Sequence, residues 1–366
     1  MKELFKELTL ASGAGGDEGD VRRIARRELG DAVDELRADR MGNLFATLNG
    51  RGKDAPVLML TAHMDEIGLM VSGIESFGGV RFEKLGWIDD RMLISRLVTI
   101  STRKGKVPGV IGVPAASKTT AEEKTKPTPY KKLYVDVGSF SKAETEALGI
   151  RVGDLITFRG DFVELANNIT VSKSVDDRIG LYMLIEIMKR LKGQKHEATV
   201  VAACLAQHEI GLRGAIPAAY SIHPDVSIHL DVTGHFLDDP PAGGLMGGGP
   251  ILRLMEDYGT QIGFGAQKGV IAHRDVVDLL IKCAEEKDLR YQLQIKPDVI
   301  GDEVVIHTSR EGVLAGYILI PARYIHSQHE CLKWDDVEQV VTLAVAFSTA
   351  VTRKFVDAAI DLDRVA

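Results

Sequence analysis

The sequence predicts an α/β protein whose mostly parallel sheet has helices on both faces and carries a small, inserted β-barrel-like domain. Two observations support this fold class: short apolar runs alternate with helical patterns over most of the chain, and the texture changes between residues 69 and 165. The length of 366 residues exceeds what one hydrophobic core usually organises. We therefore expect two domains.

The first elements are a helix and a buried strand. Apolar residues recur at helical spacing over residues 17–29, after an acidic start and before Gly30, which predicts an amphipathic helix. Residues 55–62 form a continuous apolar run, which is typical of a strand covered on both faces in a parallel sheet. This strand leads directly into His63.

Two later apolar runs have the same form. Residues 198–206 end at Gln207-His208-Glu209, and residues 226–230 end at Asp231. Because ligands bind at the carboxyl ends of the strands in open parallel sheets, we expect these polar residues to gather at one edge. Helices are predicted between and after these strands, over residues 178–191, 273–287 and 335–356.

The insertion is predicted from short apolar segments that Gly, Pro and charged turns separate. No long helix fits residues 69–165, and the polar stretch 117–132 is predicted to be a mobile loop. Residues 1–68 and 166–366 would then form one catalytic domain that is split in the sequence.

Composition excludes several partners. The formal net charge is −7, so the chain lacks the basic excess that nucleic-acid binding requires. We find no apolar run of membrane-spanning length and no apolar segment near the N-terminus, so we expect no membrane partner and a cytoplasmic location. The three cysteines are scattered and form no CxxC pair, which leaves His and carboxylates as the only metal ligands.

Candidate ligands lie at the predicted strand ends, although each has an alternative explanation. His63-x-Asp65 places two side chains on one side of an extended segment, but such a pair alone is commoner at plain strand ends. Asp177, at a helix start, is better explained as a cap than as a ligand. Glu209 and Asp231 each need compensation, which a bound cation or a nearby arginine, Arg178 or Arg213, would give. His326 follows another apolar segment, residues 314–320.

Other catalytic motifs are missing. No GxSxG elbow, P-loop or GxGxxG lies at a strand-to-helix junction, which disfavours a serine hydrolase, an NTPase and a Rossmann dehydrogenase.

Taken in order, the motifs resemble those of the tetrahedral glutamyl and deblocking aminopeptidases, also called cellulase-M-like proteins. The resemblance covers nearly the whole chain, and in the insertion it matches the family's dimerisation domain. The matching segments are His63-x-Asp65, Asp176-Asp177-Arg178, Glu209-x-Gly211-Leu212-Arg213-Gly214-Ala215, Asp231-Val232-Thr233 and Arg323-Tyr324-Ile325-His326-Ser327.

The resemblance implies a di-metal exopeptidase that acts on short peptides. Two divalent ions, zinc or cobalt with manganese as a further option, would be bridged by Asp176. One ion would also bind His63 and Asp231, and the other Glu209 and His326. Asp65 would orient the His63 imidazole by accepting its other N–H. The family also forms homo-oligomers, in which dimers assemble into a hollow dodecamer.

Two departures from the family pattern affect the expected chemistry. His208 stands where the family has a glutamate that acts as general base, so we predict an intact metal site with slower or redirected hydrolysis. Two alternatives remain open: a catalytically weakened homologue that serves as a binding or assembly subunit, and a di-metal hydrolase of another amide. In the second departure, residues 300–305 replace small family residues with larger or charged ones, although Asp302 matches the family's aspartate.

Overall fold

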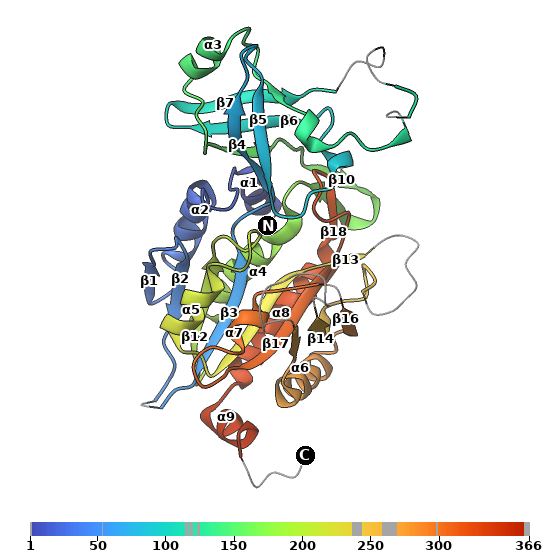
Figure 1. Ribbon diagram of the computed structural model, residues 1–366. Coiled ribbons are helices and arrows are strands. Elements are labelled where there is room, and N and C mark those ends of the chain that lie inside the picture. The colour runs from blue at the N-terminus through green and yellow to red at the C-terminus, as the bar shows by residue number, and fades with distance from the viewer. Residues whose placement is uncertain are drawn as a thin grey trace.

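The computed structural model describes residues 2–52, 54–113, 117, 120–122, 125–235, 244–257, 269–297 and 299–361. A large mixed sheet with packed helices forms the lower part of the molecule, and a small β-barrel lies at one end of it (Figure 1). This arrangement confirms the predicted fold class. Within the described residues, no helix is long and apolar enough to cross a lipid bilayer.

The large sheet has twelve strands within the described residues, and its centre is parallel. Strands β12, β3, β13 and β17 are neighbours in that order and run in the same direction, while β1, β2, β18, β11 and β10 extend the sheet with antiparallel pairs. The strands are β1 (Glu35–Ala38), β2 (Leu44–Leu48), β3 (Val57–His63), β10 (Val163–Leu165), β11 (Ile169–Ser172), β12 (Thr199–Leu205), β13 (Val226–His235), β14 (Ile251–Asp257), β15 (Gly269–Ile271), β16 (Gln292–Pro297), β17 (Leu314–Arg323) and β18 (Glu330–Lys333).

Helices cover both faces of this sheet. They are α1 (Lys2–Leu10), α2 (Gly19–Leu29), α4 (Val175–Leu191), α5 (Ala215–Ile222), α6 (Arg274–Glu286), α7 (Glu303–Ile306), α8 (Trp334–Ala350) and α9 (Arg353–Ala359). Leu58 and Leu60 of β3 pack in the cluster that contains α1, α2, α4, α6 and α8, whereas Met59 packs in the cluster with α5. Alternate residues of a strand face opposite sides of the sheet, so β3 presents apolar side chains to both faces, as the continuous apolar run predicted.

The barrel closes on itself in the order β4-β5-β8-β7-β6-β9 and has its own hydrophobic core. Its elements are β4 (Gly68–Ile74), β5 (Val80–Leu85), β6 (Leu97–Thr102), β7 (Gly105–Ile111), β8 (Val135–Asp136), α3 (Lys142–Ala147) and β9 (Leu155–Phe158). Short 3₁₀ helices occupy Asp90–Met92, Tyr130–Lys132 and Ala166–Asn168. Strand β10 belongs to the large sheet, so the chain returns to that sheet before residue 166.

Most predicted elements are confirmed, and two differ. Strand β13 runs to His235, so Asp231 lies inside the strand rather than after it. The predicted helix over 335–356 is two helices, α8 and α9, because the backbone is extended at Val351 and Thr352. Of the predicted loop 117–132, residues 118–119 and 123–124 lie outside the described residues.

The core around β3 gives a stability prediction. Replacing the fully buried Leu60 with Ala should lower the free energy of unfolding by about 2–5 kcal/mol, because the lost contacts leave a cavity. Denaturant titration followed by circular dichroism measures this change. Leu10→Ala is the matched control, since Leu10 is 39% exposed, and its effect should stay near about 0.5 kcal/mol. Equal losses for both variants would contradict the packing described here.

Candidate metal centre

A pocket of about 550 Å³ lies at the carboxyl ends of the parallel strands, on the side of the sheet that faces the barrel. Side chains after β12, within β13 and after β17 line it, together with Gly86 and Trp87 from the barrel. The pocket therefore stands where an open parallel sheet places ligands, as the strand-end residues predicted.

His63 and Asp176 form the centre of the site. His63 is the last residue of β3 and is fully buried, and its Nε2 lies 3.0 Å from Oδ1 of Asp176. The other ring nitrogen, Nδ1, lies 3.0 Å from the backbone carbonyl oxygen of Asp65 and 3.5 Å from its carboxylate. Asp176 stands at the start of α4, where its backbone N–H donates to Glu330. Both groups are thus fixed by backbone contacts as well as by each other.

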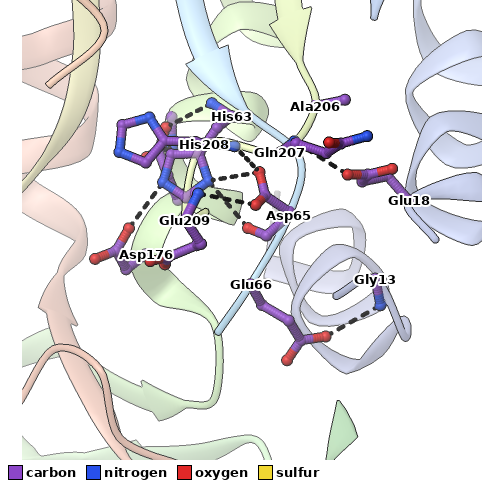
Figure 2. Close-up of polar contacts among 12 residues, drawn as sticks. Gly13, Glu18, His63, Asp65, Glu66, Asp176, Ala206, Gln207, His208 and Glu209 are labelled. Carbon is purple, nitrogen blue, oxygen red and sulfur yellow. Dashed lines mark hydrogen bonds and ion pairs between the residues drawn. The ribbon is translucent and has the colours of Figure 1, made fainter. Parts of the chain in front are cut away.

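Asp65 holds the loop that follows β12. Its two carboxylate oxygens accept the backbone N–H groups of His208 and Glu209, at 2.9 Å and 3.0 Å (Figure 2). Asp65 is fully buried, so its carboxylate fixes the direction in which both side chains leave the loop. The sequence analysis predicted that the Asp65 carboxylate accepts the N–H of the His63 ring. In the structure, the backbone carbonyl oxygen of Asp65 lies nearer to Nδ1 of His63 than the Asp65 carboxylate does.

His326 joins the same cluster from the loop after β17. Its Nε2 lies 3.4 Å from Oδ2 of Asp176 and 3.7 Å from Oε1 of Glu209. Ligand atoms of His63, Asp176 and Glu209 all lie within 4.8 Å of one another, and so do those of His63, His208 and Asp231. The structure therefore brings together all of the sequence-predicted site residues, which are His63, Asp65, Asp176, His208, Glu209, Asp231 and His326.

His208 lies between this cluster and a buried carboxylate. Its ring stacks on that of His63, with centroids 4.1 Å apart and an interplanar angle of 9°. Its Nδ1 is 3.1 Å from Oδ1 of Asp302, whose side chain is completely buried and has no hydrogen bond among the described residues. Among the described residues, the Asp302 carboxylate is thus compensated mainly by the imidazole of His208, and further by that of His229, whose Nδ1 is 3.9 Å away.

Burial and charge shift the pKa values of this cluster. Burial raises the pKa of Glu209 to about 7. Burial also disfavours the charged form of His326, but the carboxylates of Glu209 and Asp176 outweigh it and raise its pKa to about 10. For His208, burial is likewise outweighed by Asp302, which raises the pKa to about 9. Acids and imidazoles are therefore held close together with little solvent to screen them.

The nearby arginines do not neutralise these carboxylates. Arg178 is fully buried and donates to the carbonyl oxygens of Leu8, Ala11 and Gly13, and it also contacts Glu66. Within the described residues, no ion pair joins Arg213 to Glu209 or Asp231. Asp177 accepts the N–H of Gly180, as the capping interpretation predicted. The imidazole and carboxylate donors that remain are those that zinc, cobalt and manganese accept, so the residues fit divalent cations.

Sequence reasoning missed three buried groups near the site. Glu330 accepts the N–H groups of Asp176 and Ser327, and His229 contacts Asp231 through Nε2 at 2.9 Å. Asp302 was matched to the family pattern but given no role. His229 could have been found, because a histidine two positions before Asp231 in an apolar strand shares its face. No sequence pattern indicates the role of Glu330, because the residue whose N–H it accepts, Asp176, is far away in the sequence.

Two overlapping groups of imidazole and carboxylate ligands at the carboxyl edge of a parallel sheet define a metalloenzyme of the α/β class. The model of the M42 glutamyl aminopeptidase family matches residues 42–343, and the chain belongs to this family. This assignment confirms the resemblance and identifies the protein as a peptide hydrolase. The metallopeptidase family also implies divalent metals.

The similar proteins span nearly the whole chain. A lysyl aminopeptidase of Pyrococcus furiosus is 33% identical over 94% of this chain and 95% of its own. An aminopeptidase from the archaeon Desulfurococcus kamchatkensis has a TM-score of 0.89 and 34% identity, covering 99% of this chain and 98% of the other. Two structures of TET1 peptidase, one described as a dodecamer and one from Pyrococcus horikoshii that can assemble into a tetrahedron or a large octahedral shell, each have a TM-score of 0.84. Each is 30% identical and covers 96% of this chain and 99% of the other.

The role of Asp65 can be tested by metal binding. In Asp65→Asn one of the two backbone N–H groups loses its acceptor, because the amide nitrogen cannot accept it. The loop should shift, and the affinity for zinc, measured by calorimetry, should fall about 10- to 100-fold. Asp136→Asn is the control, since Asp136 also accepts a backbone N–H but lies in the barrel. Unchanged zinc affinity in Asp65→Asn would contradict this role.

Proposed function

We propose that this protein is an aminopeptidase that removes N-terminal residues from short peptides with the help of two divalent metal ions. Zinc or cobalt are the preferred ions, with manganese as the third candidate. One observation carries the proposal: the two carboxylate oxygens of Asp176 face different imidazoles, Oδ1 toward His63 and Oδ2 toward His326. This is the arrangement that a bridging carboxylate requires.

The ligand sets follow from this arrangement. Asp176 would be shared by the two ions, His63 and Asp231 would help to hold one of them, and Glu209 and His326 would help to hold the other. Support comes from the short distances among His63, Asp176 and Glu209 and from the position of Asp231 in the second group with His63. When bound, the two cations acidify a shared water, polarise the scissile carbonyl and anchor the free α-amine of the substrate.

The chain itself supplies the proton acceptor. His208 Nδ1 faces Asp302, so Nε2 is the nitrogen left to take the proton from water and to return it to the leaving amine. Two cations nearby disfavour an imidazolium, but the buried Asp302 carboxylate offsets part of that cost. His208 therefore serves as a proton acceptor that works less effectively beside two cations than the glutamate of the family pattern would.

The insertion has the role of assembly and access. Residues 69–165 form a separate domain through which subunits dimerise, and dimers build a dodecamer that admits short peptides and excludes folded proteins. The assemblies described for TET1 peptidase support this proposal, as does the presence of Gly86 and Trp87 in the pocket wall. We place the protein in the cytoplasm, in keeping with Cys204, Cys283 and Cys331, which are all unpaired thiols.

Two alternatives lead to different results. A weakened homologue that only binds or assembles is not favoured by the family assignment, because the similar proteins are described as aminopeptidases. A di-metal hydrolase of another amide keeps the same ligands and would act on N-acylated substrates, in which no free α-amine is present.

Metal removal tests the proposed activity. Chelator treatment should abolish release of the chromophore from a panel of aminoacyl chromogenic substrates, and zinc, cobalt or manganese should restore it, because the proposed reaction needs the metal ions to polarise the carbonyl. N-acetylated versions of the same substrates should not be hydrolysed. Turnover that resists the chelator would rule out a metal-dependent enzyme, and a preference for the acetylated series would favour the other amide hydrolase.

Substitution of His208 tests the proton acceptor. His208→Glu should raise turnover by about tenfold or more, because a carboxylate carries a proton beside two cations more readily than an imidazole does. His208→Gln should lower turnover by about 100-fold or more while zinc still binds with the same stoichiometry. An unchanged or lower rate in His208→Glu would count against this role, and loss of zinc in His208→Gln would make His208 a ligand instead.

A further inference from the structure

We infer that the pocket beside the metal centre selects substrates with an apolar N-terminal side chain and discriminates against both acidic and basic ones. This inference rests on the aminopeptidase function proposed above. It concerns the preferred N-terminal residue of the substrate. Membership of the family does not fix this preference, because the family is described as glutamyl aminopeptidases and one relative as a lysyl aminopeptidase.

Aliphatic side chains form much of the pocket wall apart from the proposed metal ligands themselves. They come from four separate segments of the chain: Leu212, Val232, Ile300, Val304, Val305 and Ile325. Val304 is 1% exposed and belongs to a hydrophobic core cluster, whereas Ile300 and Val305 are half-buried and so remain available to a ligand. A bound aliphatic side chain would remove further apolar surface from water, which is favourable.

The segment of residues 300–305 departs from the family pattern, yet it does not present its extra charge to the pocket. Glu303 is completely buried and accepts the hydroxyl hydrogen of Ser227 at 2.6 Å. Burial raises the pKa of Glu303 well above its usual range, which favours the uncharged acid. The substitutions in this segment therefore make the pocket more apolar, not more charged.

Arg253 also lines the pocket, but its charge is already balanced. Its guanidinium donates to Glu256 at 2.8 Å, to Thr233 at 3.0 Å and to Gln294 at 3.1 Å, and its side chain is only 6% exposed. A substrate carboxylate would have to compete with the buried Glu256 for this guanidinium, so the pair gives it no net attraction. Arg213 lies at the exposed rim, where solvent screens its charge.

A basic side chain finds no free acid in the same region. Glu256 accepts the N–H of Gly301 through Oε1 and the Arg253 guanidinium through Oε2, both at 2.8 Å. Glu256 itself does not line the pocket, and the carboxylates that do, among the described residues, are Asp176, Glu209 and Asp231, the proposed metal ligands. A lysine ammonium in the pocket would thus lose its hydration without gaining a partner. Only an apolar side chain enters without an uncompensated charge.

The test compares substrates that differ only in their N-terminal residue. Full-length protein reconstituted with zinc is assayed on leucyl, glutamyl and lysyl derivatives with the same chromogenic leaving group. The value of kcat/KM for the leucyl substrate should exceed each of the other two by about tenfold or more, in the range that pocket contacts provide. A glutamyl or lysyl preference would overturn the inference.

A charge placed in the wall should change the preference. Val305→Asp puts an unpaired carboxylate into the pocket and should raise the lysyl-to-leucyl ratio of kcat/KM by about tenfold or more. Ile360→Asp is the matched control: Ile360 is 64% exposed, directly follows α9 and lies outside the pocket, so the ratio for this variant should equal that of the unchanged protein. An unchanged ratio in a folded Val305→Asp variant, judged by circular dichroism, would contradict the inference.

A binding measurement separates this inference from the proposed function. Calorimetry with the zinc-loaded protein gives the affinities of free L-leucine, L-glutamate and L-lysine without any turnover. L-Leucine should bind about tenfold more tightly than either charged amino acid. If no substrate is hydrolysed but L-leucine still binds best, the pocket inference stands and the aminopeptidase proposal fails. Equal affinities, or tighter binding of a charged amino acid, would overturn the pocket inference.

Discussion

The concentration of buried acids at the carboxyl ends of the central strands is the constraint on which the site depends. Asp176 and Glu209 lie beside His63 and His326, and Asp231 lies beside His63 and His229. Among the described residues, the ion-pair partners of these three carboxylates are imidazoles. Charges held this far from water need compensation, because the interior cannot screen them. The two divalent cations that we propose would supply the required positive charge in a small volume. The donors are held in place by the apolar strands, the loop fixed by Asp65 and the start of α4.

The buried carboxylate of Glu66, close to the site, shows how basic side chains of the protein itself compensate an acid without a metal ion. Glu66 follows Asp65 directly and is also buried, but Lys173 and Arg178 contact it at 2.7 Å and 3.4 Å. The hydroxyl of Ser174 donates to the same carboxylate at 2.6 Å. This cluster ties the segment before α4 to the end of β3 without any external cation. The two clusters differ in their basic partners, and this difference supports the proposal that the first cluster holds metal ions.

Much of the fold and the candidate site could be predicted from the sequence, because the relevant signals are local. Continuous apolar runs identified β3 and β12, and polar residues after them identified His63 and Glu209. The break between α8 and α9 was not predictable, since the apolar spacing continues across it while the backbone at Val351 does not. Contacts such as that of Glu330 with Asp176 also carried no signal, because they join residues that only the tertiary structure brings together.

The exchange of glutamate for His208 changes the charge of the pocket as well as the identity of the base. It removes one negative charge beside the metal ligands, and a protonated imidazole adds a positive one. The completely buried Asp302 counters this change from 3.1 Å, and its other carboxylate oxygen lies 3.9 Å from Nδ1 of His229. In the proposed function, His208 and Asp302 act as one unit that carries a proton, in which the imidazole exchanges the proton and the carboxylate stabilises the charge. Such a unit would preserve acid–base chemistry at the position where the family pattern alone would indicate its loss.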